Sequence, residues 1–245
     1  MKEQIIKVEE LPEEISFNST LEITSNNVNR YTHGFFKYPC KFIPHIPRWA
    51  INKYTKEGDM VLDPFAGSGT TLLESVILKR NSLGIDFDNF SHLLCKTKTK
   101  PLTKKEIEEL EFIAKNLFKN NGLADLPDIH NVEHWFPKKN IELLRILKNN
   151  IDKFKSKKKI YNFLLVCFAT TIRRGSYADK SSPKPYVSTR IKKEPEDVKN
   201  AFLKIFENHI KNIREFSKLK LGKAKMISDD ARKIHDESLY NSINL

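Results

Sequence analysis

The segment VLDPFAGSGTT, at residues 61–71, constrains the fold of this chain more than any other part of the sequence. The apolar run at residues 60–63 is bounded by turn signals and predicts a short buried strand. Gly67 and Gly69 follow in a loop, and apolar residues recur at helical spacing over residues 72–77. Because a glycine has no Cβ, the backbone of such a loop can pass close beneath a ligand. The segment therefore predicts a strand, a ligand-binding turn and a helix.

The alternation of strands and helices continues beyond this segment. Residues 82–86 predict a second strand and residues 89–98 a second helix, residues 224–228 predict the last clear strand, and residues 243–245 predict the opening of another. Strands and helices that alternate at short intervals are typical of a parallel α/β sheet. Helical patterns dominate residues 102–221, which predicts a helical insertion between two strands of the sheet.

These patterns divide the chain into four expected parts. They are an N-terminal arm at residues 1–30, a ligand-binding α/β part at 31–101, a basic helical insertion at 102–221, and a third strand with the start of a fourth at 222–245.

The loop and the ends of the strands restrict the class of ligand. The loop lacks the Gly-Lys-Ser/Thr ending of a triphosphate-binding loop and the third glycine of a dinucleotide-binding fingerprint. Asp63 ends the first strand, where a carboxylate suits a cationic ammonium and repels a pyrophosphate. Asp86 ends the second strand, 17 residues beyond Gly69, where it can accept hydrogen bonds from both ribose hydroxyls. A nucleoside that carries an amino acid, S-adenosylmethionine, fits this pair better than NAD or ATP.

The run DPFAGSGTT resembles motif I of the DNA amino-methyltransferases, which transfer a methyl group to N4 of cytosine or N6 of adenine. Residues 33–44 are similar to the segment that precedes motif I in the cytosine-N4-like members of that family. Residues 84–86 resemble motif II, and residues 98–102 and 134–136 fit the family as well. The resemblance covers about residues 31–245.

Residues 227–232, ISDDAR, resemble motif III, where an acidic residue after the third strand meets the adenine amino group of the cofactor, and Asp230 is the better match. The resemblance implies a Rossmann-like α/β methyltransferase fold with a large helical insertion and S-adenosyl-L-methionine as the cofactor. The residues expected at the cofactor are Asp63, Pro64, Phe65, Gly67, Gly69, Thr70, Asp86 and Asp230.

The sequence departs from the family at the catalytic motif, which has the form Ser/Asp/Asn-Pro-Pro followed by an aromatic residue. Residues 182–186, SPKPY, are interrupted by a lysine and lie before motif III, whereas the family arrangement places the catalytic motif after it. We therefore assign no catalytic residue and expect an incomplete sheet. The expected function is the cofactor-binding portion of a cytosine-N4 DNA methyltransferase from a restriction-modification system, inactive without a second polypeptide that carries the catalytic half.

The positive charge of the chain is concentrated in its middle. Residues 96–225 hold 31 Lys and Arg against 15 Asp and Glu, a net +16, while the remainder holds 12 against 16, a net −4. A basic segment suits a polyanion such as double-stranded DNA, although a solvated lysine-rich surface gives the same count. The candidate phosphate contacts are Lys157, Lys158, Lys159, Arg173 and Arg174.

Other features bound the class of protein. The seven histidines and the three separated cysteines have no metal-ligand spacing, so we expect no metal site and reduced thiols. No apolar run approaches the roughly 20 residues that span a bilayer, and a cytoplasmic location is expected. Two alternatives stay open: a non-catalytic remnant or nucleic-acid-binding protein that retains the fold, and a methyltransferase that acts on RNA or a small molecule.

Overall fold

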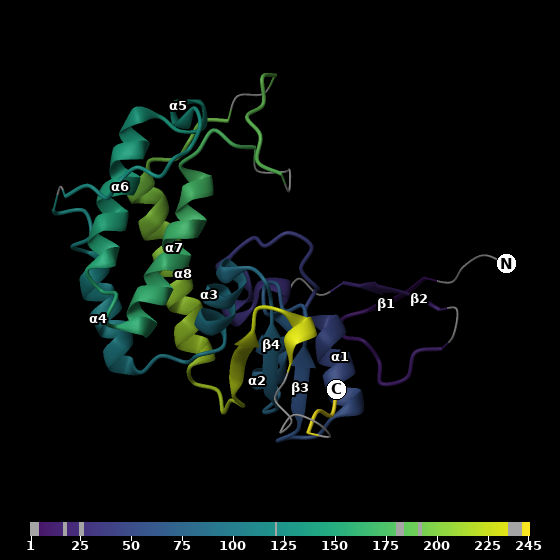
Figure 1. Cartoon of the computed structure of the whole chain (residues 1–245). Coiled ribbons are helices and arrows are strands. Elements are labelled where there is room, and N and C mark those ends of the chain that lie inside the picture. Colours follow the sequence, from purple (N-terminus) through teal and green to yellow (C-terminus); the bar gives the residue numbers. More distant parts are fainter. Residues whose placement is uncertain are drawn as a thin grey trace. The chain divides into compact units, whose positions relative to one another are not determined.

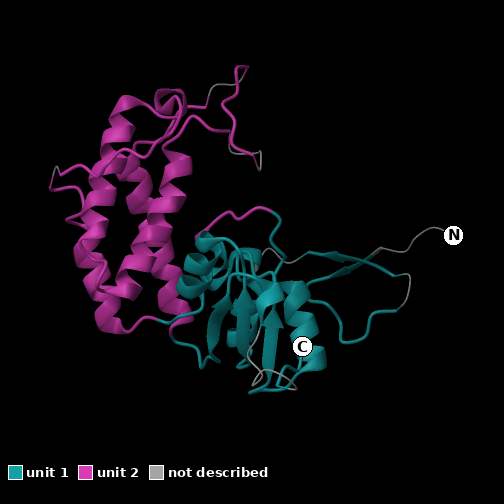
Figure 2. Cartoon of the chain, in the orientation of Figure 1, with its two compact units in different colours: residues 1–34, 40–101, 218–245 teal, residues 35–39, 102–217 magenta. Residues whose placement is uncertain are grey.

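Two units make up the chain, and Figure 2 shows them in separate colours. The α/β unit comprises Met1–Gly34, Cys40–Pro101 and Lys218–Leu245, and the helical unit comprises Phe35–Pro39 and Leu102–Ser217. The structure is a computed structural model that describes residues 5–16, 19–24, 27–120, 122–179, 184–190, 193–234 and 242–245.

A parallel three-stranded sheet forms the centre of the α/β unit (Figure 1). Its strands, in spatial order, are β3 (Met60–Asp63), β4 (Asn81–Ile85) and β5 (Ala224–Ser228). The helices of this unit are α1 (His45–Tyr54), α2 (Thr70–Ile77) and α3 (Asn89–Lys98). The expected order of strand, turn, helix and strand is confirmed, and the chain is a mixed α/β protein.

The C-terminal residues lie along the other edge of β3. The backbone N–H of Asn244 donates to the carbonyl of Met60, and that of Leu62 donates to the carbonyl of Leu245, each at 2.8 Å. Residues 243–245, where a strand was expected, therefore make backbone hydrogen bonds to β3 but do not form a regular strand. β3 has β4 on one side and the C-terminal segment on the other, so the chain passes to the opposite edge of β3 after β5. Open α/β sheets bind ligands where the order of strands reverses in this way.

Close packing of α2 on the sheet explains one glycine of β4. A Cβ at Gly84 would lie 2.6 Å from Met226 Sδ and 2.7 Å from Leu72 Cδ2. Leu72 also belongs to a buried cluster with Cys95 and with Ala66, a residue of the turn between β3 and α2. This turn therefore rests on a packed apolar layer.

A second, two-stranded parallel sheet occupies the part that was expected to be an arm. It consists of β1 (Ile5–Val8) and β2 (Thr20–Ile23), which pair from Ile5 with Thr20 to Val8 with Ile23. Both strands are only four residues long and each carries a charged residue, so the pattern is too short to distinguish them from the polar residues around them. The short 3-10 helices η1 (Asn27–Asn29) and η2 (Tyr31–Phe35) follow.

The helical unit is built around aromatic side chains. Its helices are α4 (Lys104–Ala114), α5 (Val132–Trp135), α6 (Lys138–Asp152), α7 (Lys158–Arg174) and α8 (Val198–Phe216). The ring of Phe163 meets that of Phe206 edge-on at 6.0 Å, and Phe206 stacks with Phe202 at 6.1 Å. Among the described residues, no helix is both long and apolar enough to cross a membrane.

Candidate functional site

An open cleft of about 490 Å³ lies at the carboxyl ends of the three central strands. Residues that follow β3, β4 and β5 all contribute to it, as the carboxyl ends of parallel strands meet at one edge of a sheet. Its lining residues are Pro64, Phe65, Ile85, Asp86, Phe87, Asp229, Asp230, Ala231, Arg232 and Lys233. Four of the expected cofactor residues, Pro64, Phe65, Asp86 and Asp230, are thereby brought together.

The turn between β3 and α2 requires its glycines. Gly67 and Gly69 have φ angles of +47° and +70°, in the left-handed region that other residues rarely adopt. A Cβ at Gly69 would lie 2.6 Å from Cys95 Sγ. The two glycines and Thr70 do not line the cleft, and the buried Thr70 hydroxyl lies 3.0 Å from that of Ser68. These residues shape the turn.

Asp86 links the end of β4 to this turn. Its Oδ2 accepts a 2.6 Å hydrogen bond from the Gly67 backbone N–H, and its Oδ1 accepts a 2.9 Å bond from that of Asp88. A carboxylate has about four acceptor positions, so these two bonds leave room for two ligand donors. Asp63 ends β3, where its Oδ1 accepts a bond from the Phe65 N–H at 3.1 Å.

Two aromatic rings stand exposed beside the cleft. Phe65 is 80% exposed and Phe87 is 90% exposed, and they follow neighbouring strands of the sheet. Large apolar side chains of this exposure offer a surface for a flat ligand. Phe87 was not identified from the sequence; its position directly after Asp86 is the only signal, and exposure cannot be read from a single sequence.

Asp230 is engaged by a neighbouring arginine. Its Oδ1 accepts a 2.9 Å bond from Arg232 Nε, and its Oδ2 accepts a 2.9 Å bond from an Arg232 terminal nitrogen. The hydrogen bonds from Arg232 hold the pKa of the Asp230 carboxyl well below its usual range. Asp230 is therefore an anion that a ligand amino group reaches only in competition with Arg232.

A buried polar layer lies beneath the turn. The Lys98 ammonium, 1% exposed, donates a 2.6 Å hydrogen bond to the carbonyl of Ser68. Burial lowers the pKa of Lys98 to about 7. Burial also raises the pKa of the nearby Cys95 thiol to about 12, so that thiol is unreactive at neutral pH.

Glu74 on α2 binds both α1 and the segment before it. His33 Nε2 lies 2.7 Å from Glu74 Oε1, and Arg48 Nε donates to Glu74 Oε2 at 2.8 Å. Burial lowers the pKa of His33 to about 4, so a neutral imidazole donates to the carboxylate. Burial alone would raise the pKa of Glu74, but the bonds from His33 and Arg48 outweigh it and lower the pKa.

The expected phosphate contacts do not form one cluster. Lys157, Lys158 and Lys159 lie at the start of α7, while Arg173 and Arg174 lie at its end, about 24 Å away at 1.5 Å per residue. Several are already paired within the helical unit: Lys157 with Glu109, Lys159 with Glu106 at 3.2 Å and Arg174 with Glu196 at 3.5 Å. Arg173 donates to the carbonyl of Asp179 at 3.3 Å.

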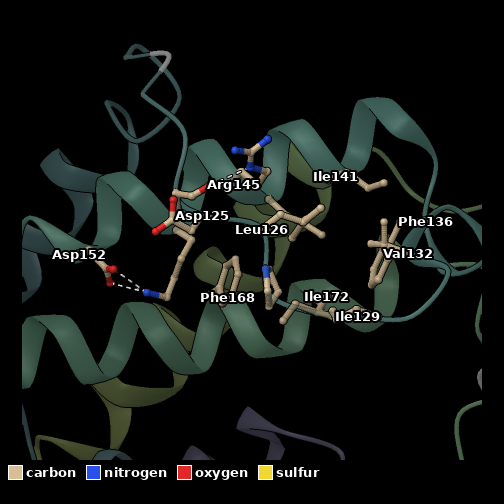
Figure 3. Close-up of a pocket in the computed structure, with 14 residues that line it drawn as sticks. Asp125, Leu126, Ile129, Val132, Phe136, Ile141, Arg145, Asp152, Phe168 and Ile172 are labelled. Carbon is tan, nitrogen blue, oxygen red and sulfur yellow. Dashed lines mark hydrogen bonds and ion pairs between the residues drawn. The ribbon is translucent and has the colours of Figure 1, made fainter.

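The helical unit contains a pocket of about 410 Å³ of different character, drawn in Figure 3. Leu126, Ile129, Phe136, Phe168 and other apolar side chains line it, and the Lys148–Asp152 ion pair lies at one end. It lacks a glycine turn and strand-end carboxylates. The cleft of the α/β unit is therefore the better candidate for nucleoside binding. Part of the SPKPY string, residues 182–183, lies outside the described residues, and within those described no group of three potential metal ligands gathers.

Comparisons with known proteins find similarity to DNA methyltransferases. A DNA methylase family model, N6_N4_Mtase, matches residues 3–96. The Type II methyltransferase M.MvaI of Kocuria varians is 27% identical over 82% of this chain and 48% of its own length. M.MjaII of Methanocaldococcus jannaschii is 37% identical over 34% of this chain and 15% of its own, and M.BamHI of Bacillus amyloliquefaciens is 42% identical over 30% and 19%.

The chain spans about half the length of M.MvaI and smaller shares of the other two relatives. No solved structure matches. The family model covers β3, the glycine turn and β4, which build one part of the cleft, but not the residues after β5 that also line it. These matches and the resemblance of residues 63–71 to motif I support a DNA amino-methyltransferase, and they leave open whether cytosine N4 or adenine N6 is the target.

Proposed function

We propose that this chain is the S-adenosylmethionine-binding portion of a site-specific DNA methyltransferase of a restriction-modification system, with a Rossmann-like fold and a cytoplasmic location. The observation that carries the proposal is the cleft at the carboxyl ends of β3, β4 and β5, with Asp86 beside the double-glycine turn. The similarity to Type II methyltransferases supports the same assignment.

In this proposal, each side of the cleft holds one part of the cofactor. The free acceptor positions of Asp86 receive the ribose hydroxyls, and the exposed rings of Phe65 and Phe87 cover the adenine. Asp63 attracts the methionyl ammonium, and Asp230 accepts from the adenine amino group once Arg232 releases it.

The bound cofactor supplies an activated methyl group on a sulfonium, so the chemistry demands little acid or base catalysis from the protein. Most of the rate enhancement then comes from holding the methyl group in line with the target amino nitrogen. The rigid turn under the cofactor and the anchoring of Asp86 to Gly67 serve this positioning.

We propose cytosine N4 as the target atom and double-stranded DNA as the substrate. The similarity of residues 33–44 to cytosine-N4-like members supports the target, and the net +16 of residues 96–225 supports the substrate. Mass spectrometry of nucleosides from DNA methylated by the active enzyme tests this directly: N4-methylcytosine is expected, and N6-methyladenine would contradict the target.

The groups that hold the target base come from outside these residues in our proposal. The 245 residues contain no Ser/Asp/Asn-Pro-Pro-aromatic sequence, which in this family accepts from the target amino group and stacks on the flipped base. We place that motif on a second polypeptide that completes the sheet. The test is transfer of labelled methyl groups to DNA by the purified chain, alone and mixed with a polypeptide that carries the motif. Activity only in the mixture is expected, and activity of the chain alone would contradict the proposal.

A further inference from the structure

We infer that Lys98 is a positioning residue for the cofactor, because its side chain fixes the peptide between Gly67 and Gly69 from below. The inference rests on the proposed cofactor site. It adds a residue that does not touch the cleft and that acts only through the turn.

The peptide held by Lys98 is the one with the greatest freedom to rotate. Ser68 stands between two glycines that both have positive φ, and glycine loses more conformational freedom on folding than any other residue. Lys98 Nζ donates to the Ser68 carbonyl at 2.6 Å, in a fully buried setting. One strong, charge-assisted hydrogen bond therefore removes a rotation that would change the shape of the turn.

Both ends of Lys98 are fixed. Its carbonyl accepts a 2.8 Å hydrogen bond from the buried Thr32 hydroxyl, so the backbone of the last residue of α3 is tied to η2. Asp86 holds the same turn at a second point, because its Oδ2 accepts a hydrogen bond from the Gly67 N–H. The turn is thus clamped between α3 and the end of β4.

The choice of lysine at this place is costly for folding. Burial lowers the pKa of Lys98 to about 7, which reflects the penalty for a charge in an apolar interior. A methionine has nearly the same shape and carries no such penalty. Residues that break the rules of core composition are expected where function requires them.

The experiment compares Lys98→Met with Lys96→Met, since Lys96 lies on the same helix but is exposed. Calorimetry with S-adenosylhomocysteine should show about tenfold weaker binding for K98M, the loss of one charge-assisted hydrogen bond, and no change for K96M. The melting temperature of K98M should stay equal or rise, because the buried amine is gone. Lys98→Arg, which keeps a donor, should recover most of the affinity.

Hydrogen exchange at the amides of residues 67–69 tests the same hydrogen bond without any ligand. Faster exchange in K98M that is confined to this turn supports the inference. An affinity and turn exchange equal to those of K96M would overturn it, as would a lowered melting temperature with faster exchange throughout the α/β unit. If K98M does not fold, K98R decides the matter. Exchange at residues 67–69 of K98R as slow as in the wild type supports the inference, and faster exchange at these residues overturns it. Absence of binding by the wild-type protein would refute the proposed function, while the exchange result would still decide the role of Lys98.

Discussion

In the α/β unit, single hydrogen bonds to two polar side chains hold the turn at residues 64–69. In the helical unit, apolar side chains packed between helices hold the structure together. Lys98 and Asp86 each fix one peptide group of the turn. Phe163, Phe202 and Phe206 instead fill the space between α7 and α8 with their rings. The geometry of the proposed cofactor cleft therefore depends on individual hydrogen bonds, and the stability of the helical unit depends on buried apolar volume.

The largest expected effect on ligand binding comes from a side chain added to the turn. Gly69→Val should weaken S-adenosylhomocysteine binding by at least about 100-fold, because a Cβ there lies 2.6 Å from Cys95 Sγ and φ is +70°. Isothermal calorimetry measures this loss. The matched control is Gly58→Val, at a positive-φ glycine with open space around its Cβ position. Equal affinities of the two variants for S-adenosylhomocysteine would show that the turn is not part of the binding site.

A cavity in the helical unit should act on stability alone. Phe163→Ala should lower the free energy of unfolding by about 3–5 kcal/mol, because Phe163 is 1% exposed and neighbours cannot refill its space. Urea unfolding followed by circular dichroism gives the value, and calorimetry at low temperature should give the wild-type cofactor affinity. A tenfold loss of affinity in the folded variant would show that the contrast between the units is wrong.

Two ion pairs made by residues of α1 allow the cost of losing a buried pair to be compared with that of losing an exposed pair. Arg48→Met should destabilise the protein by about 3 kcal/mol, since it leaves the fully buried Glu74 carboxylate without its cationic partner. Lys53→Met breaks a pair with Glu14, which is 84% exposed, together with a hydrogen bond to the Glu13 carbonyl and a contact with the Trp49 ring. It should cost about 1 kcal/mol or less. Thermal unfolding of both variants measures the difference, and equal costs would count against the anchoring role of Glu74.

The smallest expected effect concerns DNA. Replacing Lys157, Lys158 and Lys159 by Met should flatten the dependence of DNA affinity on salt, by about 0.9 in logarithmic slope for each phosphate that is no longer neutralised. Lys157 and Lys159 already pair with acidic residues of α4, so the change in slope should be smaller than three phosphates would give. Lys79→Met, which breaks an exposed pair in the α/β unit, is the control. An unchanged slope in a salt titration would assign the three lysines to a solvated surface.

The sequence predicted the sheet well because apolar runs between turn residues are a local signal. Residues 224–228 were expected as a strand, and β5 has these bounds. The helix expected at residues 104–119 ends as α4 at Ala114, where the chain continues into turns. The strands β1 and β2 were missed because each is short and carries charge.

Only some of the residues in and beneath the cleft could be predicted from the sequence, because the exposure of a side chain depends on tertiary contacts. Lys98 counts as one more basic residue in the sequence, yet it is buried beneath the turn. Phe87 resembles any core aromatic, yet it is 90% exposed. The pairing of Asp230 with Arg232 is local in sequence, but it depends on the fold of the residues after β5.

The most direct test of the cofactor cleft is calorimetric titration of the full chain with S-adenosylhomocysteine, wild type against Asp86→Asn. Asp128→Asn, at an exposed position of the helical unit, is the control. We predict one-to-one binding by the wild type and by D128N, and binding at least about tenfold weaker by D86N, because hydrogen bonds to a charged carboxylate are lost. No heat of binding from the wild-type chain, or equal affinity in D86N, would contradict the account.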